Sequence, residues 1–415
     1  MSADLHKIYP TIVTINDFPC GSGKTTKMIQ SLKQHKLYLI VVNLKSEIKR
    51  VLENTSHINL HEPTASMTKF GTKKEALLKL VSESKSIVTT HKLYNDIGQL
   101  AALGLLQKYH VVIDEVPEVI TPIISLSKKS VEEFYISKGY LNVSDNGLCS
   151  PTDKWEHSLD DVSDTLNPHI KHHAENHNLY LSKQGTFLKA VPKMLFYNCA
   201  SMTVLTYKSE GSYFLKYLDK LSVAYNVNCD KNLEKEFKAK AKALITFGET
   251  DVLKRINFTY SKQSKYGMCS KETKTVQSAL KNWRSRFLIG VPLENIMVTC
   301  AEINWRNPKA FKSKKLRLNG FSKGTGLGKV NWVANQTRGT NQYSHCSHLF
   351  YLYDKYPMPP IVQWLGSPTK EFSDAYALTE LIQWVWRSRI RNELPITLYI
   401  PSSRMKRLLL DWLKS

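Results

Sequence analysis

A glycine-rich segment near the start of the chain has the residue types that bind phosphate groups. Gly21-Ser22-Gly23-Lys24-Thr25 follows the β-branched run Thr11–Ile15 and precedes a helical stretch beginning at Lys27. Glycines let backbone amides approach phosphate oxygens without a Cβ in the way, and a helix N-terminus adds partial positive charge. We therefore predict a P-loop that binds ATP and Mg²⁺, with Lys24 on the β- and γ-phosphates and Thr25 on the metal. The residues expected at the nucleotide are Gly21, Ser22, Gly23, Lys24, Thr25 and Thr26.

Two adjacent carboxylates end a second apolar run. Tyr109–Asp114 (YHVVID) reads as a buried strand, and Glu115 follows it directly. In a parallel α/β sheet the carboxyl end of a strand faces bound phosphates. We expect Asp114 to hold Mg²⁺, directly or through water, and Glu115 to orient or deprotonate the attacking water. An ordinary acidic turn is the alternative, which the P-loop about 90 residues earlier makes less favoured.

The charge balance points to a polyanionic partner. The 415 residues contain 58 Lys+Arg and 36 Asp+Glu, a net charge of +22, which most often indicates nucleic acid. Residues 306–329 contain eight Lys/Arg and no acid, and Phe311, Phe321 and Trp332 lie among them or follow closely. Cations bind phosphates and rings stack on unpaired bases, so we favour a nucleic-acid contact over a solvated surface. The expected phosphate contacts are Lys312, Lys314, Lys315, Arg317 and Lys323.

Short apolar runs alternate with helical patterns along the whole chain. Those that read as strands are Thr11–Ile15, Leu37–Val42, Ser86–Thr90, Tyr109–Asp114, Met194–Cys199 and Met202–Thr206, then Ala243–Phe247, Ile296–Cys300, Leu349–Tyr353 and Ile396–Ile400. Helices are expected at Thr379–Ile390 and Ser403–Trp412. This alternation predicts parallel α/β sheets in two halves. We expect a first domain over residues 1–205 with an insertion at about 125–192, a linker over 206–240, and a second domain over 241–415.

The order of these motifs resembles that of superfamily 2 (DEAD/DEAH-like) helicases. After GSGKT and the Asp114-Glu115 pair come Ala200–Thr203 (ASMT), Arg338–Asn341 (RGTN) and Gln383–Arg391 (QWVWRSRIR). Phe18 replaces the usual small residue of the first motif. The resemblance covers residues from about 11 to 400 and is nearest to compact helicases of bacteriophage type. It implies an α/β fold with two RecA-like P-loop NTPase domains with parallel sheets, plus the insertion in the first domain.

The resemblance also implies roles for individual residues. Ser201 and Thr203 match the motif that couples hydrolysis to strand movement, while Gly339 and Asn341 match a loop that senses nucleotide and strand. The residues that it places on nucleic acid are Thr89, Thr90, His91 and Arg338. Those that it places in the last motif are Gln383, Arg387 and Arg391.

A role for these arginines also follows from the chemistry of phosphoryl transfer. Phosphoryl transfer spreads negative charge over the γ-phosphoryl oxygens, and a cation from the second domain would stabilise that charge. Gln383 and Arg387 are four residues apart and share a face if the stretch is helical. The spacing leaves open whether Arg387, Arg389 or Arg391 is the stabilising cation. A merely basic amphipathic helix is the alternative.

Cysteine spacing and hydropathy limit the compartment in which the protein is expected. The seven cysteines have neither metal-knuckle nor disulfide-framework spacing, and no apolar run is long enough to span a bilayer. The first residues contain no signal-peptide hydrophobic region. We therefore expect a cytoplasmic protein, in the host cytoplasm if it is viral, with no membrane partner.

The leading hypothesis is an ATP-dependent helicase or translocase on single-stranded or forked DNA, with RNA as the alternative substrate. Phage replication or recombination, with replication proteins as partners, is the expected setting. One rival is a P-loop motor that does not unwind, such as a packaging or remodelling ATPase. Another is a basic nucleic-acid-binding protein with a degenerate P-loop, against which the intact Lys24, acidic pair and arginines argue.

Overall fold

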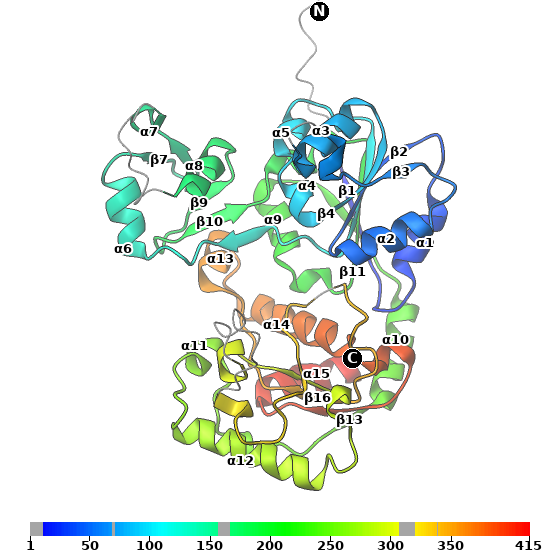
Figure 1. Ribbon diagram of the computed structural model, residues 1–415, viewed down its shortest axis with the longest axis vertical. Coiled ribbons are helices and arrows are strands. Elements are labelled where there is room, and N and C mark those ends of the chain that lie inside the picture. Colours follow the sequence, from blue (N-terminus) through cyan, green and yellow to red (C-terminus); the bar gives the residue numbers. More distant parts are fainter. Residues whose placement is uncertain (1–10, 69–70, 157–166, 307–319, 338) are drawn as a thin grey trace, which may run out of the picture. The chain divides into compact units, whose positions relative to one another are not determined.

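The computed structural model describes residues 11–68, 71–156, 167–306, 320–337 and 339–415. The chain forms two compact units (Figure 1). Unit 1 comprises Met1–Phe18, Gly23–Cys229 and Pro357–Phe372, and unit 2 comprises Pro19–Ser22, Asp230–Tyr356 and Ser373–Ser415.

Unit 1 is built on a seven-stranded sheet in which every neighbouring pair is parallel. In spatial order its strands are β12 (Tyr225–Asn228), β1 (Val13–Asp17), β11 (Ser201–Thr206), β5 (Tyr109–Asp114), β2 (Leu37–Val42), β4 (Ser86–Thr90) and β3 (Leu60–His61). Because central strands such as β2 are covered on both faces, they are continuously apolar rather than alternating. The carboxyl ends of β1, β5 and β11 therefore meet at one edge.

Helices cover both faces of this sheet. The helices are α1 (Lys24–Ser31), α2 (Lys45–Glu53), α3 (Lys73–Ser82), α4 (His91–Asn95), α5 (Gly98–Ala102) and α9 (Tyr213–Leu221). Met28 of α1 and Ile48 of α2 pack with one face of β2, and Leu77 of α3 and Phe214 of α9 pack in the core on the other. Burying both faces fixes the strand register, and with it the loops that follow each strand.

An insertion between β5 and β11 extends to one side of the sheet (Figure 1). It contains β6 (Ile120–Pro122), α6 (Lys128–Val131), a π-helix (Glu132–Ile136), β7 (Leu141–Val143), β8 (Cys149–Pro151), α7 (Asp153–Glu156), α8 (Pro168–Glu175), β9 (Leu179–Leu181) and β10 (Phe187–Ala190). β6, β10 and β9 form an antiparallel sheet, and β7 pairs with β8. Tyr135, Trp155 and Phe187 belong to a separate buried cluster, so the insertion has its own small core.

A segment from the second half of the chain belongs to unit 1. We call Pro357–Phe372, which contains α13 (Pro359–Trp364), the α13 segment. The Trp364 ring lies 4.8 Å from Tyr180 of the insertion and 6.1 Å from Tyr217 of α9, measured between centroids. Gln184 donates to Gln363 at 2.7 Å. These contacts tie α13 to both the insertion and the main domain of unit 1.

Unit 2 contains a five-stranded, fully parallel sheet. Its strands in spatial order are β13 (Ile245–Phe247), β17 (Ile396–Tyr399), β16 (His348–Tyr351), β14 (Ile296–Thr299) and β15 (Asn331–Trp332); its helices are α10 (Lys231–Leu244), α11 (Tyr260–Gln263), α12 (Lys271–Arg286), most of α14 (Lys370–Val385), and α15 (Ser403–Lys414). Trp283 of α12 stacks on Phe350, and Trp384 of α14 packs against Tyr351. Because Phe350 and Tyr351 are adjacent in β16, these helices cover opposite faces.

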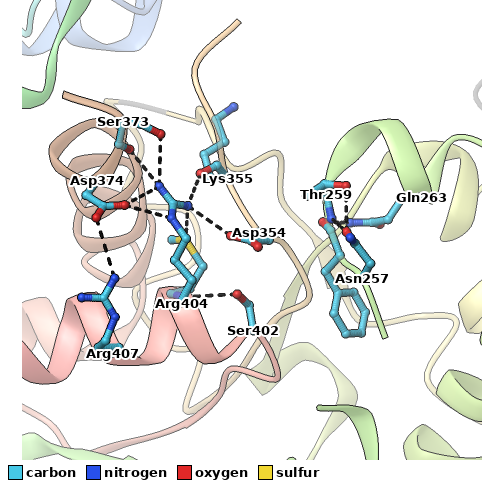
Figure 2. A network of polar contacts seen from close by, with 12 residues as sticks. Asn257, Thr259, Gln263, Asp354, Lys355, Ser373, Asp374, Ser402, Arg404 and Arg407 are labelled. Carbon is cyan, nitrogen blue, oxygen red and sulfur yellow. Dashed lines mark hydrogen bonds and ion pairs between the residues drawn. The ribbon is translucent and has the colours of Figure 1, made fainter. Parts of the chain in front are cut away.

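Arg404 holds together the two places where the chain leaves and re-enters unit 2 (Figure 2). Its guanidinium contacts Asp354 at 3.1 Å and Asp374 at 2.8 Å, and lies 4.1 Å from the Tyr356 ring centroid. It also donates to the carbonyls of Lys355 and Ser373. We call this set of contacts the Arg404 clasp, since it closes the base of the α13 segment.

The strands expected from the sequence are largely those observed, with shifts of one or two residues at their ends. Two expectations are wrong. Met194–Cys199 contains a 3₁₀ turn (Lys193–Phe196) instead of a strand, and the helix expected at Thr379–Ile390 starts at Lys370 and ends at Val385. Residues 206–240, expected as a linker, contain α9, β12 and most of α10. The spacing of the apolar residues in α9 is that of a helix packed on a core. Polar residues on either side of α9 obscured this pattern in the sequence.

Candidate nucleotide-binding site

The loop between β1 and α1 has the backbone geometry of a phosphate cradle. Gly21 and Gly23 adopt φ angles of 81° and 74°, a left-handed region that favours glycine. No described heavy atom lies within 4 Å of the position that a Cβ would take on either residue. Lys24 is the first residue of α1, and its Nζ donates to the Phe18 carbonyl at 2.8 Å. The loop therefore leaves open space at a helix N-terminus, with an ammonium group beside it.

The hydroxyl of Thr25 joins the P-loop helix to the acidic strand end. Thr25 Oγ1 lies 3.0 Å from Asp114 Oδ1 and 3.1 Å from Oδ2. The pKa of Asp114 is raised to about 6, chiefly by burial and then by the neighbouring Glu115, while the Thr25 hydrogen bond acts in the opposite direction. A partly buried carboxylate beside a hydroxyl has the ligand chemistry that Mg²⁺ prefers.

Glu115 leaves the strand in an unusual conformation. Its φ is 67°, which a residue with a Cβ adopts at a cost of roughly 1–2 kcal/mol. Its amide donates to the Leu205 carbonyl of β11 at 2.9 Å, so the neighbouring strand holds the turn in place. The Asp114 carbonyl is 2.9 Å from His91 Nε2. The strand end is thus fixed from both sides, which orients the side chain of Glu115.

Asp17 at the end of β1 was not singled out from the sequence, yet it organises the same edge. Its Oδ1 accepts from the Lys208 amide at 2.7 Å, and Oδ2 accepts from the Ser209 amide and hydroxyl at 2.7 and 2.6 Å. Lys208 itself has a left-handed φ of 57°. The only sequence signal for this connection was an aspartate at the end of the strand that precedes the P-loop.

The motif assigned to Ser201 and Thr203 is placed wrongly by the sequence resemblance. Ser201 begins β11 and pairs with His110 at the start of β5, whereas Leu205 pairs with Asp114. Ser201 therefore lies at the opposite edge of the sheet from the P-loop, where its hydroxyl contacts His110 Nδ1 at 2.7 Å. The residues that follow the carboxyl end of β11 are Tyr207, Lys208 and Ser209.

The other residues predicted in unit 1 lie at or near the edge of the sheet that carries the P-loop. Thr90 ends β4, and its hydroxyl accepts from the Leu93 amide at the start of α4. His91 follows it and contacts the Asp114 carbonyl. Thr26 is exposed on α1, and the buried Ser22 Oγ has no described hydrogen-bond partner. An orphaned hydroxyl in a glycine-rich loop fits a ligand with acceptor oxygens.

In unit 2 the structure brings two predicted motifs together. Arg391 Nη1 donates to the Thr340 carbonyl at 3.3 Å, and Thr340 lies between Gly339 and Asn341. Gln383 and Arg387 are 5% and 8% exposed, and α14 ends between them, so Arg387 lies in the turn after the helix. Arg387 Nε is buried without a described hydrogen-bond partner. Arg389 instead donates to the Pro395 carbonyl.

Only part of the basic stretch lies within the described residues. Lys312, Lys314, Lys315, Arg317 and Arg338 lie outside the described residues, while Lys323 is exposed. The expectation that Phe321 stacks on bases is wrong, because it is 0% exposed and packs near Phe258. Trp332 is covered by Arg306, whose guanidinium lies 4.5 Å from its ring centroid. Of these aromatics, Phe321 is therefore a core residue, and Trp332 is partly buried.

In the described part of the chain, no helix is both long and apolar enough to cross a membrane. Among the same residues, no group of three or more His, Cys, Asp or Glu side chains could hold a metal ion.

Comparison with known proteins supports the two-domain fold. Residues 216–413 match a family model described as the YonV C-terminal Rossmann-like domain. The chain is 27% identical over 424 residues to the SPbeta prophage-derived uncharacterized protein YonV of Bacillus subtilis (strain 168), covering 97% of this chain and 99% of that protein.

Among solved structures, one named XPD_APO has a TM-score of 0.52 and 13% identity, covering 97% of this chain and 95% of its own. Another, named XPD_Helicase, has a TM-score of 0.50 and 13% identity, covering 98% and 95%. The chain therefore has the expected α/β fold with two RecA-like domains and parallel sheets, as in helicases.

Proposed function

We propose that this protein is an ATP-dependent nucleic-acid helicase or translocase. The observation that carries the proposal is the pair of contacts from Thr25 to Asp114, which join a P-loop helix to an acidic strand end within a helicase-like fold. The net charge of +22 supports a nucleic-acid partner. A basic binding protein that had lost hydrolysis would not need to keep Lys24, Thr25 and Asp114 in this arrangement.

Around the P-loop each residue has a distinct part in the proposed reaction. The backbone of Gly21–Lys24 and the Lys24 ammonium bind the phosphates, and Thr25 and Asp114 would hold Mg²⁺. Mg²⁺, when bound, neutralises phosphate charge. Glu115 orients and deprotonates the attacking water, because its side chain follows the metal-binding carboxylate on a turn fixed by Leu205.

In unit 2 we assign the charge-stabilising role to Arg387 and Arg391. Gln383 accompanies them, and Gly339 and Asn341 form the loop that responds to nucleotide and strand. The contact from Arg391 to Thr340 supports a linkage between that loop and the arginines. A cation that stabilises charge on the γ-phosphoryl group accelerates transfer by roughly 10³–10⁵ in other systems.

The nucleic acid is proposed to be DNA, single-stranded or forked, with RNA as the alternative. Thr90 and His91 would contact its backbone from unit 1, because they follow β4 at the same edge as Asp114. The proposed contacts from unit 2 are Lys312, Lys314, Lys315, Arg317, Lys323 and Arg338. The prophage-derived relative agrees with a phage setting, and within that setting we propose DNA replication or recombination.

The decisive experiment measures ATP hydrolysis with and without single-stranded DNA or RNA. Lys24→Ala is expected to abolish hydrolysis, because it removes the ammonium group that we assign to the phosphates. Lys27→Ala is the matched control, since Lys27 is exposed on the same helix and has no described partner. A Lys24→Ala protein that hydrolyses ATP at the wild-type rate would overturn the proposal.

Strand displacement then separates unwinding from translocation. Duplexes with 3′ or 5′ single-stranded tails, made of DNA or RNA, are compared with wild-type protein and ATP. Displacement of one tail polarity supports a helicase. Strand-stimulated hydrolysis without displacement would instead indicate a motor that does not unwind, and binding without hydrolysis would indicate a binding protein.

A further inference from the structure

Much of the excess positive charge lies in a segment other than the basic stretch. Residues 252–287 contain nine Lys/Arg and one Glu, a net charge of +8. Residues 306–329 contain eight Lys/Arg and no acid, also +8. The two segments together therefore carry +16 of the +22 of the whole chain, although the first shows no basic cluster in its sequence.

The first of these segments exposes most of its basic side chains on and beside α11 and α12 of unit 2. Eight of its nine basic side chains are exposed, and we call them the α11–α12 basic face: Lys254, Arg255, Lys262, Lys265, Lys271, Lys274, Lys281 and Arg286. Four of them lie on the outer side of α12, the long helix on one side of the unit in Figure 1. At 1.5 Å per residue, Lys271 to Arg286 spans about 22 Å.

These cations are not balanced by neighbouring acids. None of the eight forms an ion pair with a described residue. Some exposed lysines on other helices do, as Lys49 with Glu53 and Lys129 with Glu133 show. A helix face that serves only solubility usually interleaves both signs of charge. The arrangement therefore favours an anionic partner over a solvated surface.

The face is held rigidly by the unit beneath it. Gln263 at the end of α11 is fully buried; its Nε2 donates to the carbonyls of Phe258 and Leu352, and its Oε1 accepts from the Ala301 amide. Ser270 caps the start of α12 by accepting from the Thr273 amide. A rigid surface loses little conformational entropy on binding, so less of its electrostatic binding free energy is offset.

The face also adjoins the described part of the basic stretch, at Gly320 and Phe321. Gln277 of α12 donates to the Gly320 carbonyl at 2.7 Å, and Phe321 packs against Tyr266. An open pocket of about 510 Å³ lies on the face itself, lined by Val252, Cys269, Lys271, Lys274, Thr275 and Ser278. Tyr260 and Phe287 are 63% and 49% exposed beside the cations, as rings that could contact bases.

We propose that the α11–α12 basic face is a nucleic-acid-binding surface that contacts backbone phosphates, separate from the residues already assigned to strand binding. The inference shares with the proposed function only the class of partner. It does not require that the protein hydrolyse ATP. Cations that form no described ion pair, spaced along a helix, match the continuous negative charge of a phosphodiester backbone.

The test replaces four charges and measures the salt dependence of binding. A variant with Lys271→Gln, Lys274→Gln, Lys281→Gln and Arg286→Gln is compared with one carrying Lys79→Gln, Lys85→Gln, Lys108→Gln and Lys183→Gln. The control lysines are exposed on unit 1 without a described ion pair. Fluorescence anisotropy with labelled single-stranded and duplex DNA gives Kd over a range of salt concentrations.

The first variant should bind at least roughly tenfold more weakly at about 0.1 M salt, with the slope of log K against log salt reduced by about 3–4 for duplex. The control should change Kd less than about twofold. Whether single strands or duplex lose more identifies the form bound. Equal losses in both variants would overturn the inference, because total charge would then explain binding. Loss of binding only to phosphatidylserine vesicles would overturn it in favour of a membrane surface.

A second measurement keeps the inference testable if the variant misfolds. Ultraviolet cross-linking of the wild-type protein to DNA should yield adducts at Tyr260 or Phe287, read by mass spectrometry. Adducts confined to other segments would contradict the inference. Binding of a fluorescent ATP analogue, measured on the same samples, tests the proposed P-loop independently of both outcomes.

Discussion

The carboxylate of Asp17 accepts hydrogen bonds from both the backbone amide and the hydroxyl of Ser209, at 2.7 and 2.6 Å. The two residues are 192 positions apart: Asp17 ends β1, and Ser209 follows the neighbouring strand β11. The contact fixes the loop after β11 beside the P-loop. A single carboxylate thus links the phosphate-binding segment to the end of the strand that also holds Glu115.

Replacing Asp17 by Ala should release this loop. Three hydrogen bonds to a charged acceptor are lost, so the free energy of unfolding should fall by about 2–4 kcal/mol. The amides of Lys208 and Ser209 should exchange hydrogen faster, as measured by mass spectrometry. Asp145→Ala, at an exposed position of the insertion, is the control. Unchanged exchange at Lys208 would show that Asp17 does not hold the loop.

Asp114 should make stability depend on pH. Its pKa is raised to about 6 in the folded protein, so the stability that its protonated form contributes is present at acid pH and lost as pH rises through about 6. Asp114→Asn should therefore be more stable than wild type at pH 7 without Mg²⁺, by roughly 2–3 kcal/mol. Denaturant unfolding at pH 4 and pH 7 measures this, and a pH-independent difference would contradict it.

Glu115→Gln should separate nucleotide binding from hydrolysis. The amide keeps the size of the side chain but cannot take a proton, so kcat should fall by roughly 10²–10⁴ while ATP affinity stays within a few-fold. Single-turnover hydrolysis and equilibrium binding of a fluorescent ATP analogue give the two quantities. Glu118→Gln, at an exposed position nearby, controls for the loss of charge. A small effect on kcat would remove Glu115 from the reaction.

The three arginines near the end of α14 should differ in their effect on hydrolysis. Arg387→Ala and Arg391→Ala should each lower kcat by about 10² or more without a matching loss of ATP affinity. Arg389→Ala should have only a few-fold effect, because Arg389 already donates to the Pro395 carbonyl. Arg387→Lys tests the buried position with the charge retained. A dominant effect of Arg389 would reverse this assignment.

The Arg404 clasp should stabilise the α13 segment. Arg404→Ala leaves Asp354 and Asp374 without their partly buried partner, and should cost about 3–5 kcal/mol. Limited proteolysis should then cut within Pro357–Phe372 faster than in wild type. Arg407→Ala is the matched control, since Arg407 contacts Asp374 from a half-exposed position. Equal cleavage of both variants would mean that the clasp does not hold the segment.

Local sequence patterns were enough for the sheets and for the nucleotide cradle. β2, β4 and β5 begin and end where their apolar runs do, and the spacing of Lys24, Thr25 and Asp114 predicted neighbours that the structure brings together. A parallel sheet makes this possible, because its strand ends converge at one edge.

Long-range packing explains what the sequence could not supply. Ser201 was assigned to a helicase motif by its sequence alone. The register of β11 places it at the edge of the sheet opposite to the P-loop. Phe321 lies in a basic, glycine-rich run, and only the packing against Phe258 shows that it is buried. The partners of Asp17 lie about 190 residues away, so no local pattern marks them.

The α13 segment has a consequence for how this protein can be divided. A truncation ending before Asp230 would remove Trp364 from its place against Tyr180 and Tyr217, exposing aromatic surface on the remaining half. A fragment starting at Asp230 would carry α13 with nothing to pack on. Neither half is therefore an exchangeable module, and recombination within a lineage would have to transfer both at once. Co-expressed fragments of this chain should purify together or not at all.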